Sequence, residues 1–344
     1  DQRESYQCIA VSQDGHQFRK LGNVLDVPEG YTAHFRDPKV WKENDVYYMV
    51  MGAQTLEEKG CVLLFQSKNL HQWENLGVLA DGFGYMWECP DFFSLQGKDV
   101  LLFSPQGMEP EGIHYQNTFQ SGYFIGEWKE GTNRYTHNHF QEIDHGFDFY
   151  APQTTEDEKG RRILIAWMGM ADGFEHLHPT LDYNWIHQLT IPRELSIRDN
   201  KLIQQPVEEL KQLRGNKLYD CTIKDRWNGE ISRTVEWIFK PNDEQELTLE
   251  LYNGIQLVYN QREKTLSFYR ERLDHKGHEV RTALVEGNVL EVRAYIDRSS
   301  IELFINDGEL TFTSRIFPSI KNKEMQIHGD GHLTVWNLAK KVGE

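Results

Sequence analysis

The chain has 344 residues, of which 39% are hydrophobic and 12% aromatic, and its formal net charge is −16. This length accommodates two domains that each bury a core. The acidic balance argues against a nucleic-acid partner, because a polyanion would be repelled. No segment approaches the roughly 18 apolar residues of a membrane span, so no membrane partner is expected.

Cysteine and motif patterns exclude several other classes of site. Cys8, Cys61, Cys89 and Cys221 show no C-x-x-C spacing, which predicts neither a zinc site nor a disulfide framework. No N-x-S/T glycosylation acceptor occurs, and together these patterns favour a cytoplasmic protein. No phosphate-binding loop motif is present, and we expect neither a cofactor nor a metal.

The N-terminal part of the chain contains a repeated pattern. Residues 8–22 (CIAVSQDGHQFRKLG) match residues 61–77 (CVLLFQSKNLHQWENLG), and both read as a strand, a polar turn and a short strand ending in Leu-Gly. The first copy fits only the outer half of a repeat, which would leave strand edges unpaired. We therefore expect further sequence before Asp1, including at least one N-terminal blade that is missing here.

A second pattern lies between these segments. Residues 37–52 (DPKVWKENDVYYMVMG), 89–107 (CPDFFSLQGKDVLLFSPQG) and 151–169 (APQTTEDEKGRRILIAWMG) each begin with a residue followed by proline. Pro38, Pro90 and Pro152 are 52 and 62 residues apart. Short strands recurring at this period are typical of β-propeller blades, whose first strands line a central channel. We expect Asp37, Glu88 and the segment at Tyr150 to face one pocket.

The C-terminal part predicts a different architecture. We expect the propeller to occupy residues 1–205, a linker with a short helix to follow at 206–216, and a β-sandwich to occupy 217–344. Asn306-Asp307-Gly308 separates two apolar runs, which is a strong hairpin signal. The expected strands cover residues 234–239, 246–252, 256–260, 265–269, 289–295, 301–305 and 310–314.

Two carboxyl groups on the expected inner strands are candidates for glycosidic-bond chemistry, which needs an acid and a second carboxylate. Glu88 lies between Trp87 and Cys89, and these apolar neighbours are expected to favour the protonated form that an acid catalyst needs. Asp37 follows Arg36, which favours an ionised carboxylate. A salt-bridged Glu88 and a turn-forming Asp37 before proline are the structural alternatives.

Several segments resemble glycoside hydrolase family 32, the invertases and fructosidases, and especially its bacterial sucrose-6-phosphate hydrolases. The segments are HFRDPKVW (34–41), MWECPDFF (86–93), GFDFYAPQT (146–154), ILIAWMG (163–169), LTIPREL (189–195) and DRSSIELFINDG (297–308). The resemblance implies an all-β protein with a five-bladed β-propeller and a C-terminal β-sandwich. It also implies a retaining β-fructofuranosidase that acts on sucrose, sucrose 6-phosphate or fructo-oligosaccharides.

The resemblance assigns roles to individual residues. Glu88 would be the general acid/base, Asp37 the transition-state stabiliser with Arg36 beside it, and Cys89 part of the fructose subsite. A leaving-group contact is expected from Asp144 or Asp148, with Asp144 preferred, and a local turn is the alternative. Further substrate contacts are expected from Trp87, Tyr85 and Trp185. For Tyr85 and Trp185, core packing is an equal alternative.

One family feature is absent. The nucleophile of the family is an Asp in an N-D-P-N-G motif, and this sequence contains no such motif. We therefore expect this chain to bind sugar weakly and to hydrolyse little. A non-catalytic sugar-binding or scaffold protein, a fructan hydrolase and an arabinosidase of the same fold are the alternatives. The sandwich is expected to buttress the propeller, and it is also a candidate for the contacts of a homodimer.

Overall fold

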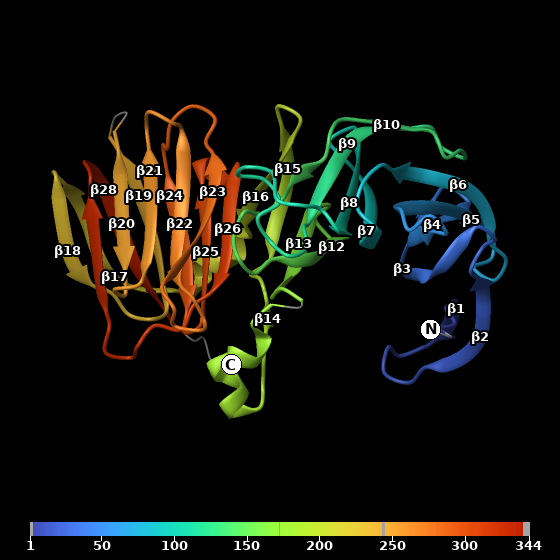
Figure 1. Cartoon of the computed structure of the whole chain (residues 1–344), viewed down its shortest axis with the longest axis horizontal. Coiled ribbons are helices and arrows are strands. Elements are labelled where there is room, and N and C mark those ends of the chain that lie inside the picture. Colours follow the sequence, from blue (N-terminus) through green and yellow to red (C-terminus); the bar gives the residue numbers. More distant parts are fainter. Residues whose placement is uncertain (1–2, 172, 243–244, 340–344) are drawn as a thin grey trace. The chain divides into compact units, whose positions relative to one another are not determined.

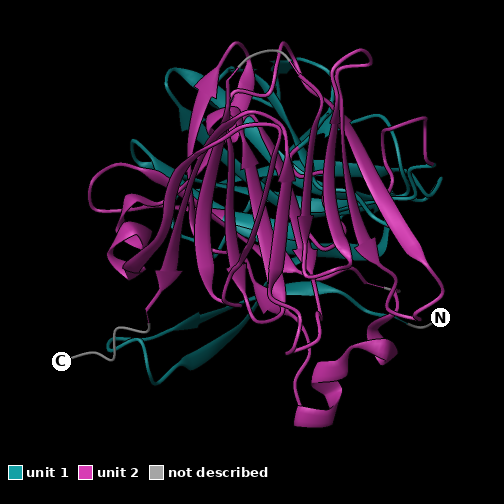
Figure 2. Ribbon diagram, turned by 90° about the vertical axis from the view of Figure 1, so that its left-hand side faces the viewer, with its two compact units in different colours: residues 1–109, 119–142, 151–153 teal, residues 110–118, 143–150, 154–344 magenta. Residues whose placement is uncertain are grey.

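The computed structural model describes residues 3–171, 173–242 and 245–339, and its regular elements are almost all β-strands (Figure 1). The chain divides into two compact units (Figure 2). Unit 1 holds residues 1–109, 119–142 and 151–153, and unit 2 holds residues 110–118, 143–150 and 154–344. This division follows compactness, and the boundaries expected at residues 205 and 216 stay a prediction.

Unit 1 opens with a two-stranded hairpin and a four-stranded antiparallel sheet. The hairpin is β1 (Tyr6–Val11) and β2 (Arg19–Asp26). The sheet has the order β3-β4-β5-β6, with β3 at Tyr31–Glu43, β4 at Val46–Thr55, β5 at Gly60–Ser67 and β6 at Glu74–Asp81. The hairpin matches the half-repeat that the sequence predicts.

A second sheet of unit 1 repeats this plan. Its strands are β7 (Met86–Leu95), β8 (Lys98–Gln106), β9 (Gly122–Trp128), β10 (Tyr135–His137) and the short β11 (Gln141–Glu142), which also pairs with β9. Pro38 lies in β3 and Pro90 lies in β7, the first strand of each sheet. The repeat found in the sequence therefore corresponds to successive antiparallel sheets of the propeller type.

Strand alternation explains how the first of these sheets is buried on both faces. In β4, Tyr48 and Val50 join one apolar cluster, whereas Met49 and Met51 join another. Successive strand residues point to opposite faces, so a continuous apolar run suits a strand that is covered on both sides. The first cluster also contains Trp87 and residues of β8 and β9, and β7 packs directly against β3, β4 and β5.

Unit 2 contains a third sheet, with order β12-β13-β15-β16 and β14 beside β13. Its strands are β12 (Tyr150–Glu156, whose residues 151–153 belong to unit 1), β13 (Arg162–Met168), β14 (Gln188–Leu189), β15 (Arg193–Arg198) and β16 (Lys201–Pro206). Between β13 and β14 the chain forms the 3-10 helices η1 (Glu175–Leu177) and η2 (Pro179–Tyr183). The helix expected after residue 206 is the 3-10 helix η3 (Glu208–Leu213).

Two six-stranded antiparallel sheets form the predicted sandwich. One has the order β17 (Arg214–Ile223), β28 (Gly331–Leu338), β19 (Val235–Pro241), β24 (Val292–Asp297), β25 (Ser300–Ile305) and β26 (Leu310–Arg315). The other has the order β18 (Arg226–Glu230), β27 (Glu324–His328), β20 (Leu247–Leu251), β21 (Ile255–Asn260), β22 (Thr265–Glu271) and β23 (His278–Leu284). Side chains from both sheets, such as Trp237 and Phe268, share one core.

The hairpin expected at Asn306-Asp307-Gly308 joins β25 to β26 as the 3-10 turn η4 (Asn306–Gly308). Asp307 has a positive φ of 63°, which explains why a turn residue is required there. Across the ranges that the structure describes, no helix is both long and apolar enough to cross a membrane.

Candidate active site

The residue before each repeat proline has an unusual backbone conformation. Asp37, Cys89 and Ala151 have φ values of 64°, 49° and 51°, in the left-handed region. The strand register shifts at the same places, between Arg36 and Lys39 in β3 and between Glu88 and Asp91 in β7. Such bulges redirect the side chains beside them and are frequent next to active sites.

The bulges bring Arg36 and Glu88 together. Arg36 donates to Glu88 Oε1 from Nε at 3.0 Å and from Nη2 at 2.6 Å. The two side chains occupy the same repeat position in β3 and β7, and they are 31% and 18% exposed. Arg36 Nε also lies 3.9 Å from Asp37 Oδ2, so one guanidinium bridges both candidate carboxylates.

Asp37 and Cys89 form the second contact between the strands. Asp37 Oδ2 accepts a hydrogen bond from the Cys89 backbone N–H at 3.0 Å and from the Cys89 thiol at 3.6 Å. Burial, followed by the charges of Asp37 and Glu88, raises the pKa of the Cys89 thiol to about 12. Cys89 is therefore a neutral donor rather than a nucleophilic thiolate.

Two residues that the sequence did not single out complete this group. Gln106, the last residue of β8, donates from Nε2 to Glu88 Oε2 at 2.7 Å. His34 Nδ1 lies 2.8 Å from Arg36 Nη1. A signal for Gln106 was present, because it follows Gln54 by 52 residues, the spacing that separates Arg36 from Glu88.

Behind the carboxylates, the residue after each repeat proline joins a polar network. Lys39 Nζ lies 3.3 Å from Asp91 Oδ2 and 3.3 Å from Gln153 Oε1. Gln153 Nε2 donates to the Cys89 carbonyl at 2.8 Å. Because Asp91 is fully buried, these contacts link β3 and β7 to Gln153 through a buried polar network within unit 1.

The environment of Glu88 differs from the one that its sequence neighbours suggested. Trp87 is fully buried, stacks on Phe103 at 4.1 Å between ring centroids and belongs to the hydrophobic cluster. Glu88 instead contacts Arg36 and Gln106, which are polar. Adjacent strand residues face opposite sides, so apolar sequence neighbours do not make an apolar pocket. Because Trp87 is fully buried, the proposed site does not include it. Tyr85 is 39% exposed, so its side chain is accessible to a ligand.

Asp144 and Trp185 lie in unit 2. Asp144 Oδ1 accepts from the backbone N–H groups of Gly146 and Thr313, and Oδ2 accepts from Arg193 Nη1 at 3.1 Å and Thr313 Oγ1 at 2.6 Å. Its side chain has no exposed surface, so these contacts favour a structural role. Trp185 is 43% exposed, and its ring covers the guanidinium of Arg315.

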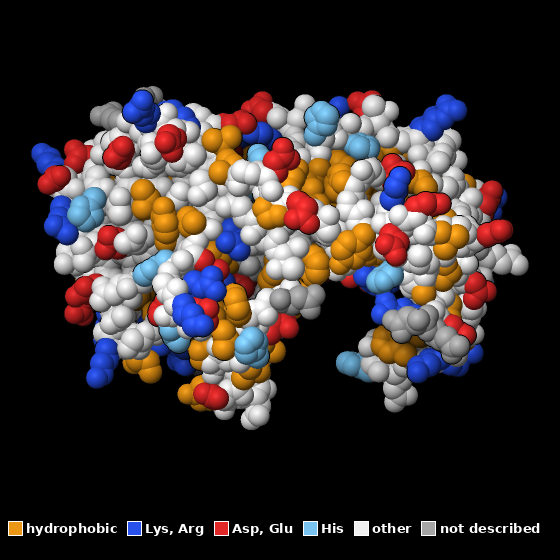
Figure 3. Space-filling view, in the orientation of Figure 1, with side chains coloured by type: hydrophobic (Ala, Val, Ile, Leu, Met, Phe, Trp, Pro, Cys, Tyr) orange, Lys and Arg blue, Asp and Glu red, His pale blue; other side chains and the backbone are white. Residues whose placement is uncertain are grey.

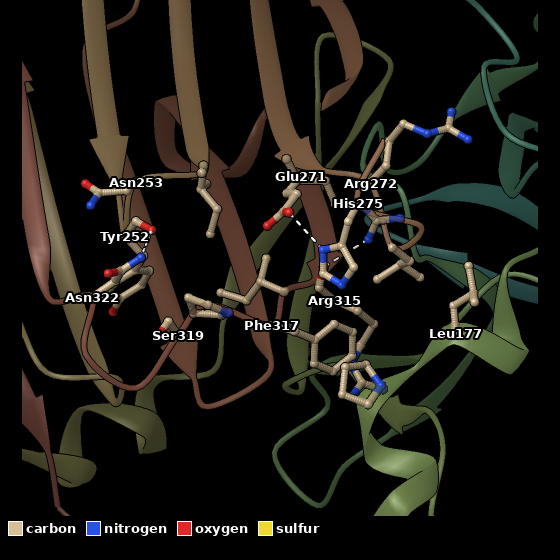
Figure 4. A pocket seen from close by; sticks show the side chains of 17 residues that line it. Leu177, Tyr252, Asn253, Glu271, Arg272, His275, Arg315, Phe317, Ser319 and Asn322 are labelled. Atoms are coloured by element: carbon tan, nitrogen blue, oxygen red, sulfur yellow. Dashed lines mark hydrogen bonds and ion pairs between the residues drawn. The ribbon is translucent and has the colours of Figure 1, made fainter. Parts of the chain in front are cut away.

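A pocket of about 160 Å³ occupies the sandwich end of unit 2 (Figure 4). Its lining includes Arg272, His275, Arg315, Phe317 and Asn322. None of these residues belongs to the carboxylate group, which lies entirely in unit 1.

Comparison with protein families gives two matches that together span nearly the whole chain. Residues 1–206 match the family model described as glycosyl hydrolases family 32 N-terminal domain. Residues 196–339 match the model described as glycosyl hydrolases family 32 C terminal.

Individual relatives agree with these matches. The sucrose-6-phosphate hydrolase of Bacillus subtilis (strain 168) is 44% identical, and the match covers 98% of this chain and 73% of the relative. A mutant of the GH32 beta-fructofuranosidase of Bombyx mori, solved in complex with sucrose, is 35% identical with a TM-score of 0.84, covering 97% and 72% of the two chains. Sucrose-6-phosphate hydrolase from Lactobacillus gasseri is 27% identical with a TM-score of 0.87, covering 97% and 72%.

Proposed function

Since this chain belongs to glycosyl hydrolases family 32, we propose that it hydrolyses terminal β-fructofuranosides, with sucrose or sucrose 6-phosphate as the substrate. The observation that carries the proposal is the contact group of unit 1. Arg36 and Asp37 of one repeat meet Glu88 and Cys89 of the next. Glu88 supplies an acid and Asp37 a second carboxylate, and hydrolysis of a glycosidic bond requires two such carboxyl groups.

We assign Glu88 as the general acid/base. Its carboxyl group is partly exposed, so it is accessible to a leaving-group oxygen. In the first step it would protonate the oxygen that leaves the fructosyl carbon, and in the second it would take a proton from water. Arg36 and Gln106 hold one carboxyl oxygen each, which fixes the direction in which the group points.

We assign Asp37 to the sugar itself. Its carboxylate is 31% exposed and is anchored through Oδ2 by Cys89. A carboxylate held in this way accepts hydrogen bonds from ring hydroxyls and stabilises positive charge that develops on the sugar ring in the transition state. Arg36 supplies a further donor, and the neutral Cys89 thiol lines the subsite.

The retaining mechanism of the proposal needs a carboxylate nucleophile besides these two groups. The sequence contains no N-D-P-N-G motif, so the proposal assigns no residue of this chain to that step.

The test uses the purified chain with sucrose, sucrose 6-phosphate, a fructo-oligosaccharide and arabinan, and measures released sugars by chromatography. Glu88→Gln should lower the rate by about 100-fold or more, because it removes the proton donor. Glu74→Gln is the matched control, since Glu74 is an exposed carboxylate of unit 1 that pairs with Gln66. Equal rates for wild type and Glu88→Gln would contradict the assignment, and release of arabinose alone would favour the arabinosidase alternative.

Binding provides a second readout that does not depend on turnover. Calorimetry with fructose should give a measurable affinity that falls about tenfold in Asp37→Asn, because the variant loses the charge that accepts hydrogen bonds from the sugar. Unchanged fructose affinity in this variant would contradict the assignment of Asp37 to the sugar, and no fructose binding by the wild-type chain would support the scaffold alternative. The cytoplasmic location and the homodimer stay predictions, and light scattering on the purified chain tests the latter.

A further inference from the structure

We propose that His34 and Gln106 are positioning residues that hold the Arg36–Glu88 pair from its two ends. The inference rests on the proposed function, because it concerns the orientation of the Glu88 carboxyl group, which we assign as the general acid/base. The four side chains form one line of contacts, from His34 through Arg36 and Glu88 to Gln106. Neither end residue contacts the other, so each would act through its own neighbour.

Gln106 has the fixed backbone that a positioning residue needs. Its carbonyl accepts a hydrogen bond from the Tyr85 backbone N–H at 2.9 Å, and Gln106 bridges to Phe119 on the other side. A Cβ added at Gly84 would lie 2.4 Å from the Gln106 carbonyl, so the chain passes close beside it. The amide therefore projects from a rigid strand end toward Glu88 Oε2.

His34 is fixed in a comparable way. Its backbone N–H donates to Thr32 Oγ1 at 3.1 Å, and that hydroxyl donates to Gln54 Oε1 at 2.9 Å. Gln54 Nε2 in turn donates to the Tyr85 carbonyl at 2.7 Å. The segment that carries His34 is thus tied to the loop before β7.

The charge state of His34 suits an acceptor. Burial, followed by the positive charges of Arg36 and Arg3, lowers the pKa of His34, while Glu88 acts in the opposite direction. A neutral imidazole with its proton on Nε2 leaves Nδ1 to accept the hydrogen bond from Arg36 Nη1. Arg36 then has Nη1 on His34 and both Nε and Nη2 on Glu88, so its guanidinium plane is defined.

This arrangement limits the freedom of a side chain with three rotatable bonds. Glu88 Oε1 is held through Arg36 and Oε2 through Gln106, so the carboxyl plane is defined by contacts at both oxygens. A catalytic acid misplaced by about 1 Å loses much of its effect. His34 and Gln106 would therefore set how well Glu88 reaches the leaving oxygen without touching it themselves.

The test follows the Glu88 carboxyl directly by carbon-13 NMR of the full chain labelled at glutamate carboxyl carbons, with Glu88→Gln assigning the resonance. Gln106→Leu keeps the side-chain size but removes the donor to Glu88 Oε2, so the carboxyl resonance of Glu88 should move away from its wild-type chemical shift. His34→Leu should move the resonance by a smaller amount, because Arg36 loses one of its anchors. His34→Gln offers an amide oxygen to Arg36 and should restore the wild-type chemical shift.

Gln66→Leu is the matched control, because Gln66 donates to Glu74 Oε2 at 2.7 Å on the exposed side of the same unit. It should leave the Glu88 resonance unchanged. An unchanged Glu88 chemical shift in both Gln106→Leu and His34→Leu, with unfolding curves like that of wild type, would overturn the inference. The NMR readout needs no turnover, so a chain that fails to hydrolyse sucrose contradicts the proposed function and leaves this result to stand on its own.

Discussion

At the scale of single residues, the carboxylate of Asp37 affects the ionisation of the neighbouring Cys89 thiol. Its thiol and its backbone N–H both point at Asp37 Oδ2, so the carboxylate anchors the strand and suppresses ionisation of the sulfur. Burial is the larger cause of the raised pKa, and the Asp37 charge comes second. Replacing Asp37 should therefore release part of this effect.

Thiol reactivity measures that release. With a pKa of about 12, Cys89 should resist alkylation by iodoacetamide at about pH 8, whereas the exposed Cys8 reacts. Asp37→Asn removes a negative charge and should increase the Cys89 alkylation rate by about tenfold. Peptide mass spectrometry gives the rate for each cysteine. Rapid labelling of Cys89 in the wild-type chain would contradict the assignment of a neutral thiol.

Repeat spacing and motif predicted Arg36, Asp37, Glu88 and Cys89 on equivalent strands, and the structure brings these four side chains into contact. Their catalytic roles stay predictions. The hydrogen bonds among these residues could not be predicted. They depend on β-bulges, and a bulge does not show in the alternation of apolar and polar residues along the sequence. The rule that strand neighbours face opposite sides would have separated Trp87 from Glu88 beforehand.

At the scale of elements, close approach of strands is what brings the two repeats together. Gly52 in β4 lies opposite Arg36, and a Cβ there would stand 2.2 Å from the Trp87 carbonyl of β7. That carbonyl belongs to backbone and cannot rotate away. The strand carrying Glu88 therefore depends on the absence of a side chain at residue 52.

Gly52→Ala tests this dependence. The added methyl group should push β7 away and lower the free energy of unfolding by about 3 kcal/mol, as overpacking against backbone does. Urea denaturation followed by fluorescence gives the value. Gly254→Ala is the control, because its nearest neighbour would be Glu271 Cβ at 4.0 Å. Equal losses in the two variants would show that the close approach carries no cost.

An ion cluster within one sandwich sheet links stability to pH. Glu236 in β19 accepts from Arg214 at 2.6 Å and from Arg293 at 2.8 Å. Burial raises the pKa of Glu236, but these two arginines outweigh burial and the net pKa is lowered. A carboxyl group whose pKa is lower in the folded state stabilises that state at any pH above its pKa in the unfolded state. This contribution is lost as the pH falls through the pKa of the group in the folded state.

Wild-type stability should therefore fall as the pH decreases from about 5 to about 3. Glu236→Gln should show a flatter dependence and should be less stable near neutral pH by about 3 kcal/mol, since it leaves two arginines without their carboxylate. Chemical denaturation across this pH range provides the comparison. Parallel curves for the two proteins would show that other groups cause the acid sensitivity.

Most elements of the sandwich were predictable because their apolar residues alternate. The expected strand at residues 234–239 is β19, and the hairpin at Asn306-Asp307-Gly308 is confirmed as β25, η4 and β26. The strand expected from residue 289 begins at Val292 instead. Leu290, Val292 and Ala294 alternate with Glu291 and Arg293, so the apolar pattern begins before the residue at which strand pairing begins. The sequence alone therefore does not mark where the strand starts.

For the molecule as a whole, the net charge of −16 is the dominant electrostatic fact. On the face shown in Figure 3, acidic and basic side chains are interspersed rather than gathered by sign. Local pairs therefore offset part of the repulsion, while the excess of acidic groups still opposes the compact state.

Salt should reveal this repulsion. At about pH 8, raising sodium chloride from about 20 to about 300 mM should increase the melting temperature by about 3 °C, because screening weakens repulsion between surface charges. At pH 5.4, near the isoelectric point, the same addition should have little effect. Scanning calorimetry at both pH values checks the difference. A fall in melting temperature with salt at the higher pH would mean that favourable ion pairs outweigh the net charge.

The three positions around the repeat prolines have a consequence for how such a site arises. Arg36 and Glu88 are copies of one position, Asp37, Cys89 and Ala151 of the next, and Lys39, Asp91 and Gln153 of a third. The left-handed backbone is common to all copies, whereas the side chains differ in charge and size. A chain with identical repeats would keep the bulges but would not place a carboxylate, a guanidinium and a thiol side by side. The proposed chemistry would therefore depend on the differences between the repeats rather than on the backbone that they share.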